Sequence, residues 1–375
     1  MRALVTTLAA LAALLAAVPA ASGARSAPQG FFGVMYDHGV ASAPADVQDG
    51  QWELMATSGV ESVRTVFNWD AAQHDGRGTP ISFAQTDPVV RRAALRNIEV
   101  LPIIFYAPRW ARAYPNRTTS PPRRRSDYVT YLAALVDRYG PGGKFWAENP
   151  ELPEQPLREW QIWNEPHLLA YWDAPEKGPF GYARAYPLLL RSSYNIIKSV
   201  DPGAKVVMAG ITQRAWEEIA VLYDRGIRRY FDVAALQIFP QTVKRAIKAT
   251  RFFRETMRLR GDRRKPIYLT EITWPASKGR TQGIRYQRQE TPAGMAAKLS
   301  QMYSAMVARR RKLGVRKVFW YTWASPYGRG GSIFNYAGLQ RFDDGSFQRQ
   351  PALSAYQRSA QRFQGCLKTA TGVCQ

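Results

Sequence analysis

Two apolar segments that each end in a glutamate constrain the fold of this chain more than any other feature. The first is residues 158–166, Arg-Glu-Trp-Gln-Ile-Trp-Asn-Glu-Pro, in which an apolar strand leads to Glu165. Pro166 then removes a backbone donor and ends the strand. The second is residues 266–271, Pro-Ile-Tyr-Leu-Thr-Glu, which ends in Glu271. Each segment places a carboxylate at the C-terminal end of a strand, which predicts that the two glutamates share one site.

The spacing of these segments indicates a parallel α/β sheet. Two further apolar runs, residues 205–211 and 233–240, lie between the glutamates and are separated by helix-like stretches. The glutamates therefore follow strand n and strand n+3 of a repeating strand–helix pattern. If the sheet closes into a (β/α)8 TIM barrel, the C-terminal ends of different strands converge on the face that holds the active site.

The rest of the chain fits this pattern as a single domain over residues 25–365. We expect further strands at residues 32–36, 60–69, 100–106 and 315–322. We expect helices where apolar residues recur with a period near 3.6, at residues 51–58, 88–97, 128–139, 180–200, 215–226, 242–260, 292–313 and 351–362. The long loops at residues 111–127 and 277–291 are predicted to border the cleft.

Arg64 is the one charged side chain in the apolar strand expected at residues 60–69. A buried guanidinium is costly unless a carboxylate pairs with it. Arg64 is therefore predicted to pair with a carboxylate, and a structural ion pair with an acidic residue away from the site is one possibility.

The Trp-Asn-Glu-Pro segment, the Leu-Thr-Glu segment three strands later and Arg64 together resemble the clan A retaining glycoside hydrolases. Residues 182–194 and 201–206 are most similar to the family 39 and family 5 branches of that clan. The resemblance implies that Glu165 is the acid/base, that Glu271 is the nucleophile and that Arg64 keeps Glu271 ionised. Like charge and burial near the apolar strand would then keep Glu165 protonated.

The same resemblance implies the residues that bind the sugar. Asn164 would hydrogen-bond the 2-hydroxyl, and Trp323 would form the floor under a sugar ring, although burial in the core is the alternative for this ring. His38 and Trp274 complete the expected substrate-binding set. Strand six departs from the clan, where His and Tyr are common near its end. Here Gln237 can still support the nucleophile by a hydrogen bond, whereas the side chain two residues later, Phe239, has no hydroxyl.

The two ends of the chain indicate an exported protein. Residues 1–24 combine an early Arg, an apolar run and a small-residue exit, which is typical of a signal peptide. The apolar run is short for the alternative, a membrane anchor. We expect the mature protein to be secreted or held at the cell surface, with no membrane span and as a monomer. Cys366 and Cys374 are predicted to form a disulfide in the tail, residues 366–375.

The formal net charge of +23 favours association with anionic surfaces, although a solvated basic surface is the simpler account of it. His38, His74 and His167 lack the spacing of metal ligands, so we expect no metal and no cofactor. The leading hypothesis is a secreted retaining β-glycoside hydrolase with a carbohydrate substrate and no nucleic-acid partner. The alternatives are a carbohydrate-binding barrel that has lost catalysis and a basic surface protein that binds a polyanion.

Overall fold

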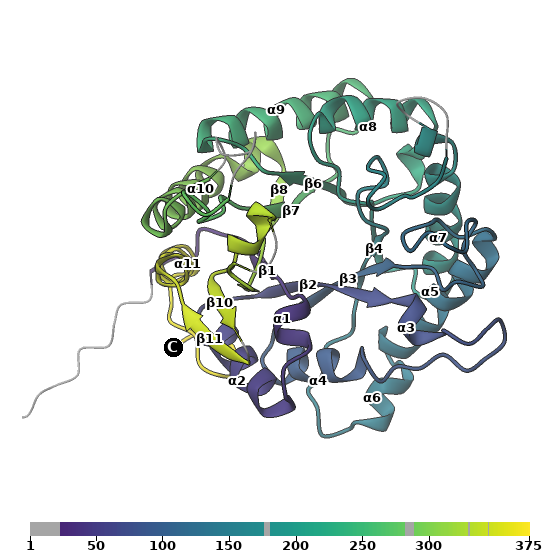
Figure 1. Ribbon diagram of the computed structural model, residues 1–375, viewed down its shortest axis with the longest axis horizontal. Helices are drawn as coiled ribbons and strands as arrows, with labels where there is room; N and C mark the ends of the chain where they lie inside the picture. Colours follow the sequence, from purple (N-terminus) through teal and green to yellow (C-terminus); the bar gives the residue numbers. More distant parts are fainter. Residues whose placement is uncertain (1–22, 176–180, 282–288, 329–330, 344) are drawn as a thin grey trace, which may run out of the picture.

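The protein folds as a single (β/α)8 barrel, shown in Figure 1. The computed structural model describes residues 23–175, 181–281, 289–328, 331–343 and 345–375, and the side chain of His38 lies outside the described set. The predicted signal peptide therefore falls almost entirely outside the described residues. The barrel strands are β1 (Phe32–Met35), β2 (Ser62–Asn68), β3 (Glu99–Phe105), β4 (Glu159–Ile162), β5 (Lys205–Val207), β6 (Ala234–Ile238), β7 (Ile267–Ile272) and β8 (Val315–Trp320).

Every pairing among these eight strands is parallel, in the order β5-β4-β3-β2-β1-β8-β7-β6. Two parallel backbone bridges, Val207 with Val233 and Ile211 with Leu236, join the remaining edges and close the ring. Glu165 follows β4 and Glu271 lies near the end of β7, so the predicted separation of three strands is confirmed. Parallel closure places both glutamates at the same end of the barrel.

Helices surround the strands because each connection between parallel strands must cross back over the outside of the sheet. The principal helices are α2 (Ala45–Thr57), α4 (Asp87–Leu95), α5 (Arg125–Tyr139), α7 (Tyr186–Val200), α8 (Ala215–Asp224), α9 (Val243–Leu259), α10 (Pro292–Leu313) and α11 (Pro351–Gln364). Thr291 caps α10 by accepting a hydrogen bond from the backbone N–H of Gly294. Residues 181–184 form a 3-10 turn, so the helix expected from residue 180 begins six residues later, at Tyr186.

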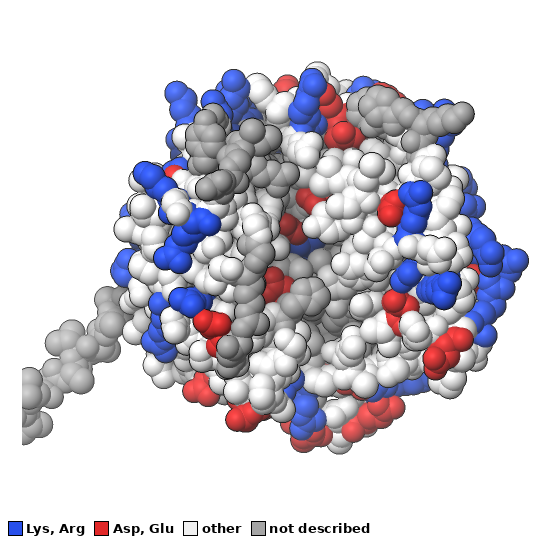
Figure 2. Space-filling model, viewed as in Figure 1, with Lys and Arg blue, Asp and Glu red and all other residues white. Residues whose placement is uncertain are grey.

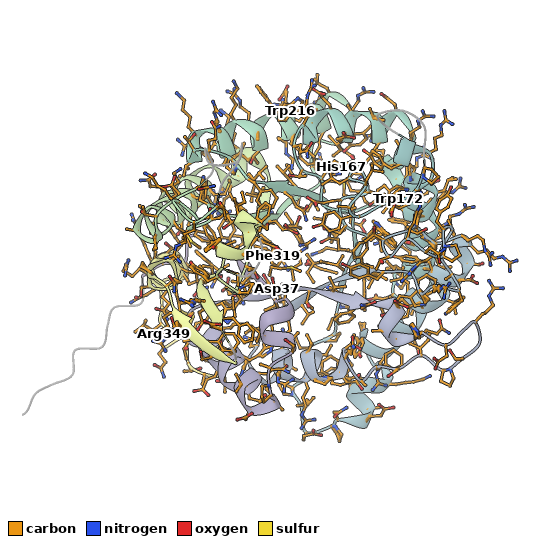
Figure 3. All side chains as sticks on the ribbon, in the orientation of Figure 1. Asp37, His167, Trp172, Trp216, Phe319 and Arg349 are labelled. Atoms are coloured by element: carbon orange, nitrogen blue, oxygen red, sulfur yellow. A yellow bond between two sulfur atoms is a disulfide. The ribbon has the colours of Figure 1, made fainter. Side chains whose placement is uncertain are left out.

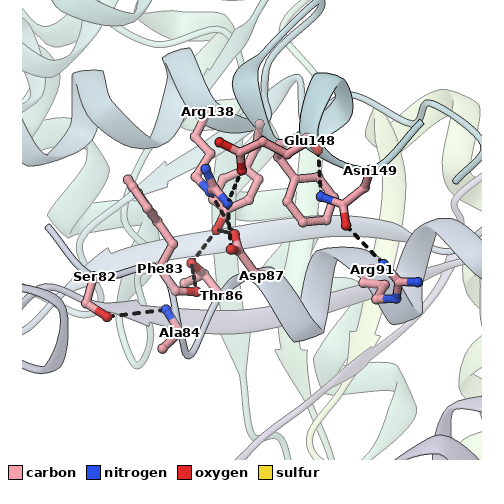
Figure 4. Close-up of polar contacts among 11 residues, drawn as sticks. Ser82, Phe83, Ala84, Thr86, Asp87, Arg91, Arg138, Glu148 and Asn149 are labelled. Carbon is pink, nitrogen blue, oxygen red and sulfur yellow. Dashed lines mark hydrogen bonds and ion pairs between the residues drawn. The ribbon is translucent and has the colours of Figure 1, made fainter. Parts of the chain in front are cut away.

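An arginine of α5 ties the outer helices together (Figure 4). Arg138 donates two hydrogen bonds to the carboxylate of Asp87 in the first turn of α4, at 2.7 and 2.6 Å. It also lies 3.0 Å from Glu148 of the short helix α6 (Lys144–Glu148) and 4.6 Å from the ring centroid of Phe83. The planar guanidinium thus joins three segments of the helical layer.

A small sheet that sequence reasoning did not predict lies beside the barrel mouth. It consists of β9 (Ala324–Ser325), β10 (Gln340–Asp343) and β11 (Ser346–Arg349), and it lies close to the short helix α1 (His38–Ala41) in Figure 1. In the tail, Cys366 and Cys374 form a disulfide. Among the described residues, no helix is both long and apolar enough to cross a membrane.

Candidate active site

Glu271 lies in a buried hydrogen-bonding network at the C-terminal end of the barrel. One of its carboxylate oxygens, Oε1, accepts a hydrogen bond from Nη1 of Arg64 at 2.7 Å and another from Nε2 of Gln237 at 2.8 Å. Arg64 is fully buried and Glu271 is 8% exposed. The structure thus brings together the carboxylate and the two residues that the sequence predicted to support it.

Arg64 also orients the strand that carries the other glutamate. Its Nε donates to Oε1 of Gln161 at 2.8 Å, and its Nη2 donates to Oδ1 of Asn164 at 2.8 Å. Gln237 donates to the same Asn164 oxygen at 3.0 Å. Because both contacts take up the oxygen of the Asn164 amide, its NH2 group is left as the donor for another partner.

Glu165 has different surroundings from Glu271. Its Oε1 is buried and has no hydrogen-bond partner among the described residues. Burial and then the nearby charge of Glu271 raise the pKa of Glu165 well above its ordinary value, while Arg64 acts in the opposite direction. Burial also raises the pKa of Glu271, but the charge of Arg64 and its direct hydrogen bond oppose that rise. Of the two carboxyl groups, Glu165 therefore holds a proton more readily than Glu271.

The backbone leading to these side chains is strained. Trp163 and Glu165 both have positive φ, 69° and 38°, although neither is glycine. Tyr106, at the end of the neighbouring strand, has φ of 58°. Non-glycine residues in this region persist only where surrounding contacts hold them, and they cluster at functional sites. Here backbone bonds from Trp163 to the Ile104 carbonyl (3.2 Å) and from Glu165 to the Gly210 carbonyl (3.2 Å) hold the turn.

Gly210 makes space for the Gln237 side chain. A Cβ atom built on Gly210 would lie 2.6 Å from both Cδ and Nε2 of Gln237, closer than real Cβ contacts. The glycine after β5 therefore allows the amide of Gln237 to reach Glu271 and Asn164. Sequence reasoning did not identify this residue, because its role depends on a side chain from the next strand.

A third carboxyl group, Asp37, adjoins the glutamates and was not predicted. It follows β1, and Figure 3 shows it near the middle of the barrel opening. Burial and the charge of Glu271 raise the pKa of Asp37 to about 7. Its position directly after a strand was the available signal, but the residue predicted to bind the substrate there was its neighbour His38, whose side chain lies outside the described residues.

The prediction that Trp323 and Trp274 contact the sugar is wrong, and for Trp323 the alternative of burial in the core holds. Trp323 and Trp274 are both fully buried, so neither ring is accessible to a ligand. The indole N–H of Trp323 donates to Gln51 at 2.9 Å, which fixes this ring within the core. Tyr321, two residues earlier, is instead partly exposed at the site. Burial and the charges of Asp37 and Glu271 raise its pKa well above the ordinary value, which places it beside the carboxyl groups.

A second partly exposed aromatic residue, Tyr171, faces the same charges. Burial and then the charges of Glu165 and Glu271 raise its pKa. Its backbone carbonyl accepts a hydrogen bond from the Trp163 indole at 2.7 Å, which ties the loop after β4 to the segment that carries Glu165. Tyr321 and Tyr171 are therefore the partly exposed aromatic residues beside the carboxyl groups, where Trp323 and Trp274 are buried. Figure 2 shows a hollow in the centre of this face, with acidic groups and a basic group at its bottom.

The described residues contain no group of three or more His, Cys, Asp or Glu side chains placed to hold a metal ion. His167 instead accepts a hydrogen bond from the backbone N–H of Thr212 at 3.3 Å, and burial lowers its pKa to about 4. A neutral ring with one nitrogen as acceptor fits a structural role between β4 and β5.

No family model matches the sequence, and no curated protein matches it. Solved structures do resemble its fold. A family 39 glycoside hydrolase from Bacteroides cellulosilyticus WH2 aligns with a TM-score of 0.66 and 20% identity over 90% of this chain. This chain spans 64% of the length of that protein.

Two further solved structures also resemble the fold of this chain. A GH39 β-xylosidase from Caulobacter crescentus aligns with a TM-score of 0.60 and 17% identity, over 89% of this chain and 72% of its own. A GH5_18 protein from Streptomyces cattleya, in complex with GlcNAc, aligns with a TM-score of 0.63 and 17% identity, over 90% and 81% of the two chains. The predicted resemblance to the family 39 and family 5 branches is confirmed for the fold.

Proposed function

We propose that this protein is an exported, retaining β-glycoside hydrolase that cleaves a polysaccharide or oligosaccharide. Glu165 is its acid/base and Glu271 is its nucleophile. The observation that carries the proposal is the unequal environment of the two carboxyl groups. Arg64 and Gln237 hydrogen-bond Glu271, whereas Glu165 has a buried oxygen without a partner and a strongly raised pKa. Double displacement requires this division between an ionised and a protonated carboxyl group.

In the first step, Glu165 donates its proton to the glycosidic oxygen while Glu271 attacks the anomeric carbon. The glycosidic C–O bond breaks with its electron pair on the leaving oxygen, and an ester forms between the sugar and Glu271. The NH2 group of Asn164 is available to donate to the 2-hydroxyl of that sugar. Because Arg64 and Gln237 fix the oxygen of this amide, the donor is oriented before the substrate binds.

In the second step, the ionised Glu165 removes a proton from a water molecule, which attacks the anomeric carbon. The ester bond to Glu271 breaks and the carboxylate returns to Arg64. Two inversions at one carbon give net retention. Tyr321 and Tyr171 offer ring faces to the sugar beside the carboxyl groups, in place of the buried Trp323.

The test is a hydrolysis screen of the mature protein on aryl β-glycosides and polysaccharides, alongside Glu165→Gln and Glu271→Gln. Both variants should fold and lose turnover of substrates with poor leaving groups. Glu53→Gln is the matched control, because Glu53 is an exposed helical residue distant in sequence from both glutamates. Full activity in either site variant would refute the assigned pair. A wild-type protein that binds sugars and turns over none of the panel would favour a barrel that has lost catalysis.

A further inference from the structure

A basic cavity lies at the end of the barrel opposite the carboxyl groups. Its volume is about 1000 Å³, and its lining includes the first residues of several strands, among them Glu99 of β3, Glu159 of β4 and Lys205 of β5. Glu165 and Glu271, by contrast, lie at the C-terminal ends of their strands. Because all the strands are parallel, this cavity and the candidate active site open at opposite ends of the barrel. We call this cavity the basal basin.

The acidic residues of the basal basin are already neutralised. Buried Lys317 lies 2.7 Å from Glu159 and also contacts Glu99. Glu159 is further paired with Lys205 at 3.3 Å and accepts a hydrogen bond from the Tyr268 hydroxyl at 2.6 Å. Both carboxylates of the described lining, Glu99 and Glu159, are therefore already paired with lysines and do not neutralise the other cations of the basal basin.

Five exposed cations on the wall of the basal basin have no such partners. Within the part of the chain that the structure describes, none of these side chains makes a hydrogen bond or an ion pair: Arg263, Arg264, Arg311, Lys312 and Arg316. They come from the loop before β7, the end of α10 and the start of β8. Like charges gathered around one cavity repel each other and raise the local positive potential.

Complementing the helix dipole explains only part of this arrangement. Arg311 and Lys312 lie in the last turn of α10, where cations are favourable. Arg263 and Arg264 lie in a loop, and Arg316 is the second residue of β8, so no helix end accounts for these three. Fold stability does not require them either, since they are exposed and pair with no residue that the structure describes. A ligand that carries several negative charges does account for all five.

We propose that the basal basin binds a polyanion whose charges are phosphate groups. Four of the five free cations are arginines, whose guanidinium groups pair with two oxygens of a phosphate at once. Tyr268 is the only aromatic residue among the described lining residues, and its hydroxyl is bonded to Glu159. Recognition by stacking of sugar rings or bases is therefore disfavoured. Four of the cations are neighbours in the sequence, Arg263 with Arg264 and Arg311 with Lys312, which suits the closely spaced charges of a phosphate chain better than a polymer with one carboxylate per sugar. This proposal does not depend on the hydrolytic function.

The test measures binding of fluorescently labelled inorganic polyphosphate to the full mature protein by polarisation, over a range of NaCl concentrations. The basin variant replaces four lining arginines with glutamine: Arg263→Gln, Arg264→Gln, Arg311→Gln and Arg316→Gln. A control variant removes the same total charge at exposed arginines elsewhere: Arg123→Gln, Arg124→Gln, Arg125→Gln and Arg349→Gln. Figure 3 shows Arg349 at the edge of the molecule. Circular dichroism establishes that both variants fold.

We expect the basin variant to lose roughly tenfold or more in affinity. The slope of the logarithm of its binding constant against the logarithm of the NaCl concentration should become shallower by about one unit for each contact removed. The control variant should keep wild-type binding within about twofold, because long-range net charge is largely screened. Polygalacturonate at equal charge concentration should compete weakly. Equal losses in the two variants would show that binding follows net charge alone and would overturn the proposal. Stronger competition by polygalacturonate would overturn the assignment of phosphate.

Discussion

Gly210→Ala tests whether the Gln237 contact to Glu271 supports the proposed nucleophile. Gly210 is not among the glycines with a positive φ, so alanine suits the backbone. The added Cβ would lie 2.6 Å from Cδ and Nε2 of Gln237, whose side chain is fully buried. The clash is therefore expected to displace the amide from Oε1 of Glu271 while the barrel stays folded.

The size of the effect follows from the bond that is lost. A hydrogen bond to a charged group contributes about 1.5–3 kcal/mol, which corresponds to a loss of roughly 10- to 150-fold in kcat/KM. With one donor fewer, the buried carboxylate of Glu271 is harder to ionise. The acid limb of the pH profile should therefore move to higher pH.

The assay is a comparison of kcat/KM for Gly210→Ala, Gln237→Ala and the double variant, on the substrate that the screen identifies. Because Gln237→Ala removes the atoms that clash, the double variant should be no worse than Gln237→Ala alone. Thermal unfolding checks that each variant is folded. If the loss of kcat/KM in the double variant equals the product of the two single losses, Gly210 does not act through Gln237. Wild-type activity in Gly210→Ala would refute the reasoning.

Three further predictions concern proton transfer and stability. Because Glu165 must be protonated to act, activity should fall as pH rises through its raised pKa. With aryl glycosides that have very good leaving groups, the pH–activity profile should lack this fall at high pH. A profile that still falls with such substrates would contradict the assignment. The pKa of Asp37 is about 7 in the fold, above its ordinary value of 3.8, so the fold favours its protonated form and this stabilisation is lost as pH rises between those values. Asp37→Asn should therefore gain thermal stability relative to wild type across that range, and parallel melting curves at pH 4 and pH 7 would exclude the effect. Arg138→Met should lower the free energy of unfolding by about 2 kcal/mol through loss of its paired bonds to Asp87, measured by urea denaturation. Arg91→Met, which breaks an exposed ion pair with Glu151, should lower the free energy of unfolding by clearly less than Arg138→Met does, because solvent screens that pair, and equal costs for the two variants would refute the distinction.

The features that the sequence predicted correctly share a local physical cause. A charged residue inside an apolar strand needs a carboxylate partner, and the family resemblance then named Glu271 as the partner of Arg64. Prolines and strand patterns fixed Glu165 and Glu271 at strand ends, and the order of strands then placed them three strands apart. These signals lie within single strands, so they could be read without knowledge of packing.

The features that the sequence did not predict depend on how strands meet. Trp323 and Tyr321 are two residues apart near the end of β8, and only the path of the chain beyond the strand decides which ring faces the cleft. The raised pKa of Asp37 arises from burial and from a glutamate on another strand. The basal basin gathers arginines from separate segments of the sequence, so composition indicated the charge but not its location.

The most direct test of the central claim uses azide to rescue the two alanine variants. In Glu271→Ala a small anion can occupy the space of the missing carboxylate and attack from that side, so the account predicts an α-glycosyl azide. In Glu165→Ala, azide should intercept the glycosyl ester from the opposite side and give a β-glycosyl azide, provided that the leaving group is good. Product anomers are identified by NMR. The reverse pattern, or release of the inverted sugar by the wild-type enzyme, would contradict the assignment of these two glutamates as a retaining pair.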